Sequence, residues 1–191
     1  AGQDAVTGSG IVDANDGAVA ISANRNVTLG SGGTEATNGV TLAADQALWV
    51  NGNVNADSNS DGTGDIDLDA TNGSLWANGT LDGANLTADA GNTLTIAGNT
   101  TTTGAIIIGG TTVPTGDISI TATNVDATGD ITVNGGADVS QSGTLDTDGA
   151  LSITNGGAVD LDGTVGAASI ALDAAGDVDA AGTLSIDGSG L

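Results

Sequence analysis

The 191-residue sequence contains no cysteine, methionine, histidine, tyrosine or phenylalanine, and its only aromatic residues are two tryptophans. Without cysteine or histidine the chain can form no disulfide framework, no thiolate or imidazole metal site, and no cysteine- or histidine-based catalytic centre. One residue is basic against 24 acidic residues, and the formal net charge is −23. A chain of this charge repels phosphate backbones, so nucleic acid is excluded as a partner.

Long apolar runs are absent as well. Nowhere do ~18 apolar residues follow one another, so we expect no membrane insertion. The first residues, AGQDAVTGSG, lack the basic start and apolar stretch that a secretory signal has. A single proline and an even spread of glycine, asparagine and aspartate offer no linker, so we expect one domain over residues 1–191.

The chain does contain a repeat of short apolar segments, three in each unit of about 19 to 21 residues. The units nearer the N-terminus are weaker but legible. In one of them the third apolar position is taken by a polar residue, Thr100, and the unit at Val6 and Val12 is incomplete. The pattern predicts eight coils plus a fragment. The clearest triplets are Ile131, Val139 and Leu145, then Leu151, Val159 and Val165, then Ile170, Val178 and Leu184.

Within each segment apolar residues alternate with small or polar ones, as in Ile118/Ile120 and Leu151/Ile153. A period of two is typical of a strand, and no sustained helical period occurs. Three short strands per unit at a fixed register predict an all-β fold, a right-handed parallel β-helix (β-solenoid) with three strands per coil. We expect almost no helix.

Turn residues repeat with the strands. A glycine comes shortly before the third strand of most units, and we expect these corner glycines to be required by a positive φ. The positions are Gly52, Gly79, Gly98, Gly143, Gly163 and Gly182. Extra residues fall near 55–65 and 109–117, where we expect corner insertions on the outer surface.

Two C-terminal units, DGALSITNGGAVDLDGTVGA and ASIALDAAGDVDAAGTLSID, carry a family likeness. They resemble the repeats of filamentous-haemagglutinin-type exoproteins, large surface adhesins exported by two-partner secretion. The likeness extends from about Ile11 to the C-terminus. It implies a secreted or surface-attached fibrous stalk of a Gram-negative bacterium, extracellular and active in adhesion, aggregation or biofilm formation. No secretion-domain motif of that family is visible in this sequence.

The first insertion has the spacing of a cation-binding loop, DxNxDGxxD. Oxygen-bearing side chains at alternate positions, with glycine at the sixth, let a loop wrap around calcium. Leu68 stands where the bidentate glutamate of a full EF-hand loop would be. A solvated acidic turn is the alternative explanation. The candidate Ca2+ ligands are Asp57, Asn59, Asp61, Thr63 and Asp65.

Trp49 and Trp76 each follow an inward leucine, so alternation points both outward at matching positions of consecutive coils. We expect them to stack and to form a binding surface for a sugar ring or a protein partner. The alternative is that they cover the solenoid beneath an insertion. Asp160 and Asp179 are also expected to stack one coil apart and to repel, so salt or divalent cations should stabilise the fold.

These features favour a non-enzymatic structural segment of an extracellular adhesin or filament. Its expected partners are a host or neighbouring cell surface and further copies of itself, through homotypic end-to-end or lateral association. A calcium-dependent self-assembling fibre subunit is one alternative. Another is a polysaccharide lyase or hydrolase of the β-helix type, because aspartate pairs can cleave glycosidic bonds. Lyases of this fold generally need a basic residue, and only Arg25 is available.

Overall fold

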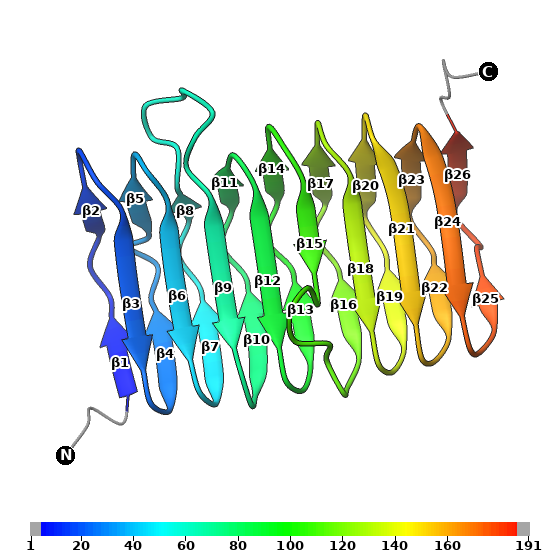
Figure 1. The fold of residues 1–191 in the computed structure, drawn as a ribbon, viewed down its shortest axis with the longest axis horizontal. Coiled ribbons are helices and arrows are strands. Elements are labelled where there is room, and N and C mark those ends of the chain that lie inside the picture. The colour runs from blue at the N-terminus through cyan, green and yellow to red at the C-terminus, as the bar shows by residue number, and fades with distance from the viewer. Residues whose placement is uncertain (1–4, 187–191) are drawn as a thin grey trace.

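The computed structural model describes residues 5–186, which form 26 β-strands and no helix. In Figure 1 the strands nearest the viewer run downward and those behind run upward while the chain advances from left to right, which is a right-handed winding. No helix in the described part of the chain is long and apolar enough to cross a membrane. The predicted all-β, right-handed parallel β-helix is confirmed.

Strands at equivalent positions of successive coils pair in parallel and build three sheets. The first sheet contains β1 (Ala5–Gly8), β4 (Asn26–Leu29), β7 (Ala47–Val50), β10 (Ser74–Ala77), β13 (Leu94–Ile96), β16 (Ile118–Ile120), β19 (Val139–Gln141), β22 (Val159–Leu161) and β25 (Val178–Asp179). The second contains β2 (Val12–Ala14), β5 (Thr34–Ala36), β8 (Val54–Asn55), β11 (Leu81–Gly83), β14 (Thr100–Thr102), β17 (Asn124–Ala127), β20 (Thr144–Thr147), β23 (Thr164–Ala167) and β26 (Thr183–Ile186). The third contains β3 (Val19–Ala23), β6 (Val40–Ala44), β9 (Ile66–Ala70), β12 (Leu86–Ala90), β15 (Ile106–Ile108), β18 (Ile131–Gly135), β21 (Ala150–Asn155) and β24 (Ser169–Ala174).

Eight complete coils, each with three strands, follow the pair β1 and β2. This agrees with the predicted eight coils and with Val6 and Val12 as the last two strands of an incomplete one. The third strand of the coil that begins at Val19 is not apparent in the sequence. It is β5, where Thr34 takes the inward position opposite Val12 and Val54.

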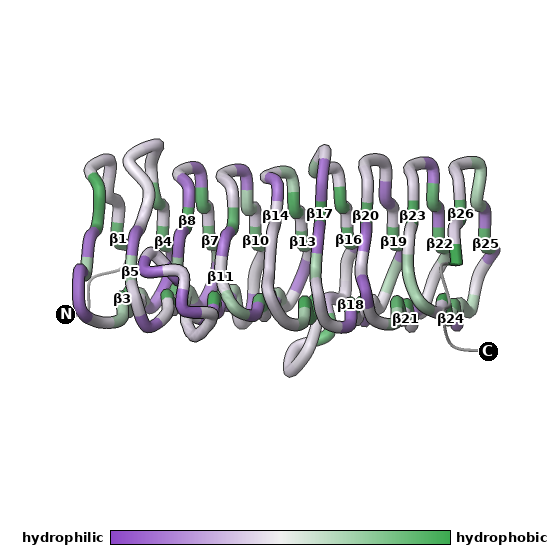
Figure 2. Tube along the Cα trace, turned by 90° about the horizontal axis from the view of Figure 1, so that it is seen from above, coloured by the Kyte–Doolittle hydropathy of each residue, from purple (hydrophilic) through white to green (hydrophobic). Residues whose placement is uncertain are grey.

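The core runs along the solenoid axis as columns of inward side chains. One column of the third sheet is fully buried from Val40 through Ile66, Leu86, Ile106 and Ile131 to Leu151. Figure 2 shows hydrophobic residues recurring in each coil as the chain winds. Each fully buried aliphatic side chain contributes about 1.5 to 3 kcal/mol, and neighbouring coils share the burial.

Two threonines interrupt the inner column of the second sheet. Thr100 is buried and donates its hydroxyl hydrogen to the carbonyl of Gly98 at 3.4 Å. The hydroxyl of Thr34 is buried with no hydrogen-bond partner. A hydroxyl left unpaired in a core costs about 1 to 3 kcal/mol, so Thr34 is a weak point of its coil.

The expected positive φ at the corner glycines is wrong. The positive-φ glycines of the described chain are Gly33, Gly39, Gly62 and Gly109, and none of them is a predicted corner glycine. A Cβ at Gly98 would lie 1.7 Å from the carbonyl oxygen of Gly79. The corner excludes side chains because the backbones of stacked coils touch there, and not because of backbone strain.

Two connections are longer than the others. Residues 56–65, here called the first loop, join β8 to β9 and project beyond the coils (Figure 1). Residues 109–117, here called the second loop, join β15 to β16 and lie against the third sheet. Neither connection interrupts the ladder, since β8 pairs with β11 and β13 with β16.

Candidate functional site

The first loop is held by hydrogen bonds to its own carboxylates. Asp57 accepts the backbone N–H of Asp61 at 3.0 Å and that of Gly62 at 2.8 Å, one on each carboxylate oxygen. The backbone has a positive φ at Ser60 (56°) and at Gly62 (78°), and these two residues reverse the direction of the chain. Asp57 therefore serves as the hub of a tight turn at the tip of the loop, while the base of the loop is bonded to the body, where Ser58 donates its backbone N–H to the carbonyl of Ala36 at 3.0 Å.

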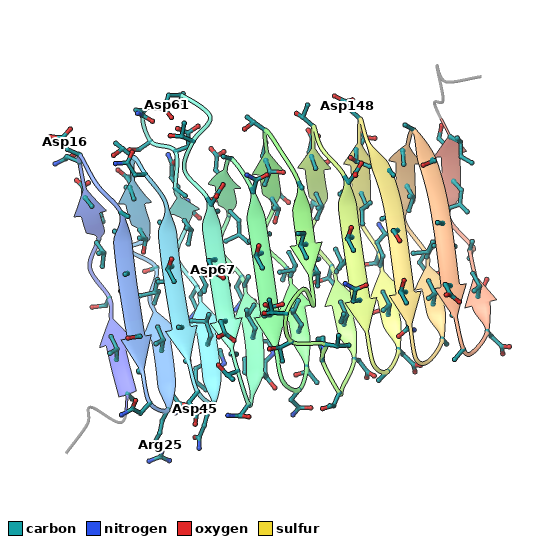
Figure 3. All side chains as sticks on the ribbon, in the orientation of Figure 1. Asp16, Arg25, Asp45, Asp61, Asp67 and Asp148 are labelled. Carbon is teal, nitrogen blue, oxygen red and sulfur yellow. The ribbon has the colours of Figure 1, made fainter. Side chains whose placement is uncertain are left out.

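Asp61 forms the second hub, at the exposed tip of this loop (Figure 3). Its carboxylate accepts the Asn59 amide at 2.7 Å and both the backbone N–H and the hydroxyl of Thr63. These bonds, the Thr63 hydroxyl first, lower the pKa of Asp61 below its usual value. A carboxylate that stays ionised is the state a cation requires.

Four of the five predicted calcium ligands are thus brought together: Asp57, Asn59, Asp61 and Thr63. The fifth is bonded elsewhere, because Asp65 accepts the side-chain amide of Asn85 from the next coil at 2.8 Å. Within residues 5–186 no group of three acidic side chains is arranged to hold a metal ion. Calcium binding by this loop stays a prediction.

Trp49 and Trp76 stack as predicted. They are paired in the ladder of β7 and β10, their ring centroids are 5.2 Å apart and their planes differ by 4°. Both side chains are partly exposed. Parallel stacking at this distance brings about 0.5 to 1.5 kcal/mol beyond the area the rings bury.

Polar side chains accompany the indole pair at matching positions. Asn51 and Asn78, two residues after each tryptophan, are exposed, and the Asn78 amide donates to the Asn51 carbonyl at 2.8 Å. On the outer sides of the pair, Thr28 is the ladder neighbour of Trp49 and Thr95 that of Trp76. The predicted two-residue surface is therefore part of a larger neutral one.

A third group, on the outer face of the third sheet, has no counterpart in the sequence-based expectations. Asp89 is buried and accepts the backbone N–H of Gly110 at 2.6 Å, that of Thr111 at 3.2 Å, and the Thr111 hydroxyl. It anchors the second loop to the solenoid. Only the fold brings these residues together, although the glycine pair 109–110 at the start of the insertion could have marked a loop whose N–H groups bind an anion.

Asp67 and Asp69 of β9 lie next to Asp89 on this face, Asp69 being its direct ladder neighbour. Burial, and then the charges of Asp69 and Asp89, raise the pKa of Asp67. One oxygen of Asp69 is buried without a hydrogen-bond partner, and the other accepts the Thr71 hydroxyl at 3.0 Å. Three carboxyl groups therefore lie close together on this face, where their mutual repulsion is unfavourable.

The expected alignment of Asp160 and Asp179 is present, since they are ladder partners in β22 and β25. The charge of Asp162, then slight burial and the charge of Asp179, raise the pKa of Asp160. Arg25 is exposed at the same edge of the solenoid as Asp45 (Figure 3).

No known protein family, curated protein or solved structure matches the chain.

Proposed function

We propose that this chain is a non-enzymatic structural segment of a secreted or cell-surface adhesin or filament of a Gram-negative bacterium. The observation that carries the proposal is the continuous ladder: two sheets of nine parallel strands and one of eight, paired coil to coil. Eight such coils extend about 38 Å along the axis. A ladder of this kind holds its outer residues in straight rows, which suits a stalk that spans distance and presents repeated surface.

The distribution of charge supports an extracellular rod. Acidic residues recur in the outward column of the second sheet, and a high negative charge keeps an extended protein soluble. A host or neighbouring cell surface, and further copies of the chain, are the partners we propose, in keeping with the likeness to filamentous-haemagglutinin-type repeats. The acidic members of this column are Asp13, Glu35, Asp82, Asp126 and Asp146.

Surface display tests this function. The chain is inserted between a rigid spacer and an outer-membrane anchor on non-adherent bacteria, with an unrelated solenoid of similar length as the control. We expect cells that carry the chain to aggregate or to retain more biofilm biomass than the control cells. Equal retention by both would contradict an adhesive role.

An enzyme that acts on polysaccharide is the second candidate, and the cluster of Asp67, Asp69 and Asp89 is the observation that favours it. A carboxyl group with a raised pKa next to an ionised one is the pairing that glycoside hydrolysis uses. Release of reducing ends from acidic polysaccharides, abolished by Asp67→Asn, would establish this activity. We expect none.

A calcium-dependent fibre is the third candidate, favoured by the four ligands that the first loop gathers. Electron microscopy of the protein in millimolar calcium, with and without a chelator, tests it. Fibres that disappear on chelation would support assembly linked to calcium, and isolated particles in both conditions would support a simple stalk.

A further inference from the structure

The central outward column of the first sheet is neutral along most of its length, although the chain carries a net charge of −23. It runs through seven uncharged residues from β1 to β19, and acidic residues enter only at β22 and β25. Over the same coils the outward column of the second sheet carries five acidic residues and is interrupted by Asn55 and Thr101. The neutral column consists of Thr7, Thr28, Trp49, Trp76, Thr95, Ser119 and Ser140.

The two indoles stand as a ridge on this column. They cover one face of each other, so each ring keeps its opposite face, toward Thr28 on one side and Thr95 on the other. Threonine is much shorter than tryptophan. Each remaining ring face therefore borders a lower step with a hydroxyl group at its floor, and the C–H groups of a sugar ring can pack on such a face.

Amide groups lie beside the ridge. Among the described residues, the bond between Asn51 and Asn78 is the one made by these two side chains. It leaves both N–H donors of Asn51, and the carbonyl oxygen and second N–H of Asn78, for a ligand. An apolar face with a few convergent, uncharged donors and acceptors matches the mixed character of a sugar ring.

We propose that this surface, formed by Trp49, Trp76, Asn51, Asn78, Thr28 and Thr95, binds the sugar rings of a neutral polysaccharide that lies along the solenoid. The proposal rests on the adhesive role proposed above and names its ligand chemistry. The fixed spacing of ~4.8 Å between coils presents the binding groups in a line, which a linear polymer can follow. Polyanionic glycans are disfavoured by the net charge.

A second copy of the chain fits this surface less well. Stable protein interfaces bury about 800 Å² on each partner, whereas the central column is one side chain wide. Pairing through this surface would also bring two bodies of net charge −23 side by side along their length, which an end-to-end contact between copies avoids. A single polymer chain meets neither obstacle.

Affinity electrophoresis and fluorescence test the proposal together. Gels are cast with hydroxyethyl cellulose, galactomannan or dextran as neutral probes, and with alginate as the polyanionic control. Because Trp49 and Trp76 are the only fluorescent side chains, emission reports on this surface alone. We expect retardation by at least one neutral polysaccharide, a change in emission on titration with the same polymer, and no retardation by alginate.

Variants locate the binding. The double change Trp49→Ala and Trp76→Ala should weaken binding about 10-fold. Thr28→Arg with Thr95→Arg fills both steps while keeping the indoles, and should abolish binding even if the alanine variant unfolds. Ile107→Ala, at an exposed outward position of the third sheet, is the matched control and should bind as the parent chain does.

Three results would overturn the proposal: no retardation by any neutral polymer, equal retardation of the parent and of the double arginine variant, or a dimer that the arginine changes dissociate. Display on cells separates this test from that of the adhesive role. Cells that fail to adhere while the purified chain still binds polysaccharide would remove the adhesive role and leave the site in place. If cells that display the double arginine variant still adhere, the polysaccharide site is not what mediates adhesion.

Discussion

The two loops that leave the solenoid are held in opposite ways. The first loop bonds to itself at its tip, through Asp57 and Asp61, and both hubs lie within the loop. The second loop bonds to the body: Gly110 and Thr111 donate to buried Asp89, and Pro114 accepts the backbone N–H of Gly136 from the following coil at 2.9 Å. The base of the first loop is bonded to the coils as well, through Ser58 and Ala36, so the tip is the part that the loop holds by itself. The position of the acceptors therefore decides how much of an insertion is joined to the coil stack.

The same contrast holds for glycines. A Cβ at Gly98, in the body, would lie 1.7 Å from a backbone oxygen, whereas a Cβ at Gly62, in the first loop, would come no closer than 3.9 Å to the Thr103 hydroxyl. Gly98→Ala should therefore separate two coils and cost about 3 kcal/mol. Gly62→Ala should cost about 1 kcal/mol, because its φ of 78° is strained for alanine. Urea denaturation of both variants checks the order, and a larger loss at Gly62 would contradict it.

Removal of the Asp89 side chain should give the next largest effect. Asp89→Ala leaves the N–H groups of Gly110 and Thr111 without their acceptor, and we expect a loss of about 2 kcal/mol in the free energy of unfolding. The matched change Asp61→Ala, in the first loop, removes as many hydrogen bonds but should leave the urea midpoint nearly unchanged, because that loop is exposed. Equal losses in the two variants would contradict this difference between the two loops.

A substitution of Asp67 should change the free energy of unfolding by less than the variants above, and it should raise stability instead of lowering it. Its pKa is raised in the folded chain above the ordinary value of 3.8 for an aspartate, so its protonated form favours folding. This contribution is complete below pH 3.8 and is lost as the pH rises through the folded pKa. At neutral pH, Asp67→Asn should stabilise the chain, by less than about 1 kcal/mol because solvent still reaches and screens the exposed part of this carboxylate. Thermal melts at pH 7 and pH 3.5 check this: the advantage of the variant should shrink at the lower pH, and a variant less stable at neutral pH would contradict the account.

Calcium should have the smallest effect on the stability of the solenoid body. If the first loop binds the ion, amide NMR shifts should be confined to residues 57–63, with a dissociation constant of about 0.1 to 1 mM. Asp61→Asn should remove the shifts, whereas Asp160→Asn should not. Shifts centred on the aligned pair Asp160 and Asp179 would show that the ion screens the ladder instead of filling the loop.

The repeat made most of the fold predictable from the sequence. Alternation and spacing located Leu151, Val159 and Val165 in three different sheets, as they are found. The same reasoning placed Trp49 beside Trp76, because register fixes which residues are neighbours in a parallel ladder.

What the sequence did not reveal depends on contacts between coils. The reason for the glycine at Gly98 was misassigned. A close approach of two backbones and a positive φ both select glycine, and the sequence alone does not distinguish the two causes. Thr34 was missed because its inward position carries no apolar residue. The bonds from the second loop to Asp89 join residues 21 and 22 positions apart, and their alignment depends on a loop conformation that periodicity does not specify.

Hydrogen exchange of individual backbone amides tests the central claim most directly, which is that one continuous parallel ladder joins the coils and includes the second loop but not the tip of the first. The account predicts slow exchange for the amides of central strands such as β9, β12 and β18, and protection of Gly110 and Thr111 above that of Asp61 and Gly62. Gly110 and Thr111 exchanging as fast as the tip of the first loop, or strand amides of the central coils exchanging without protection, would contradict it.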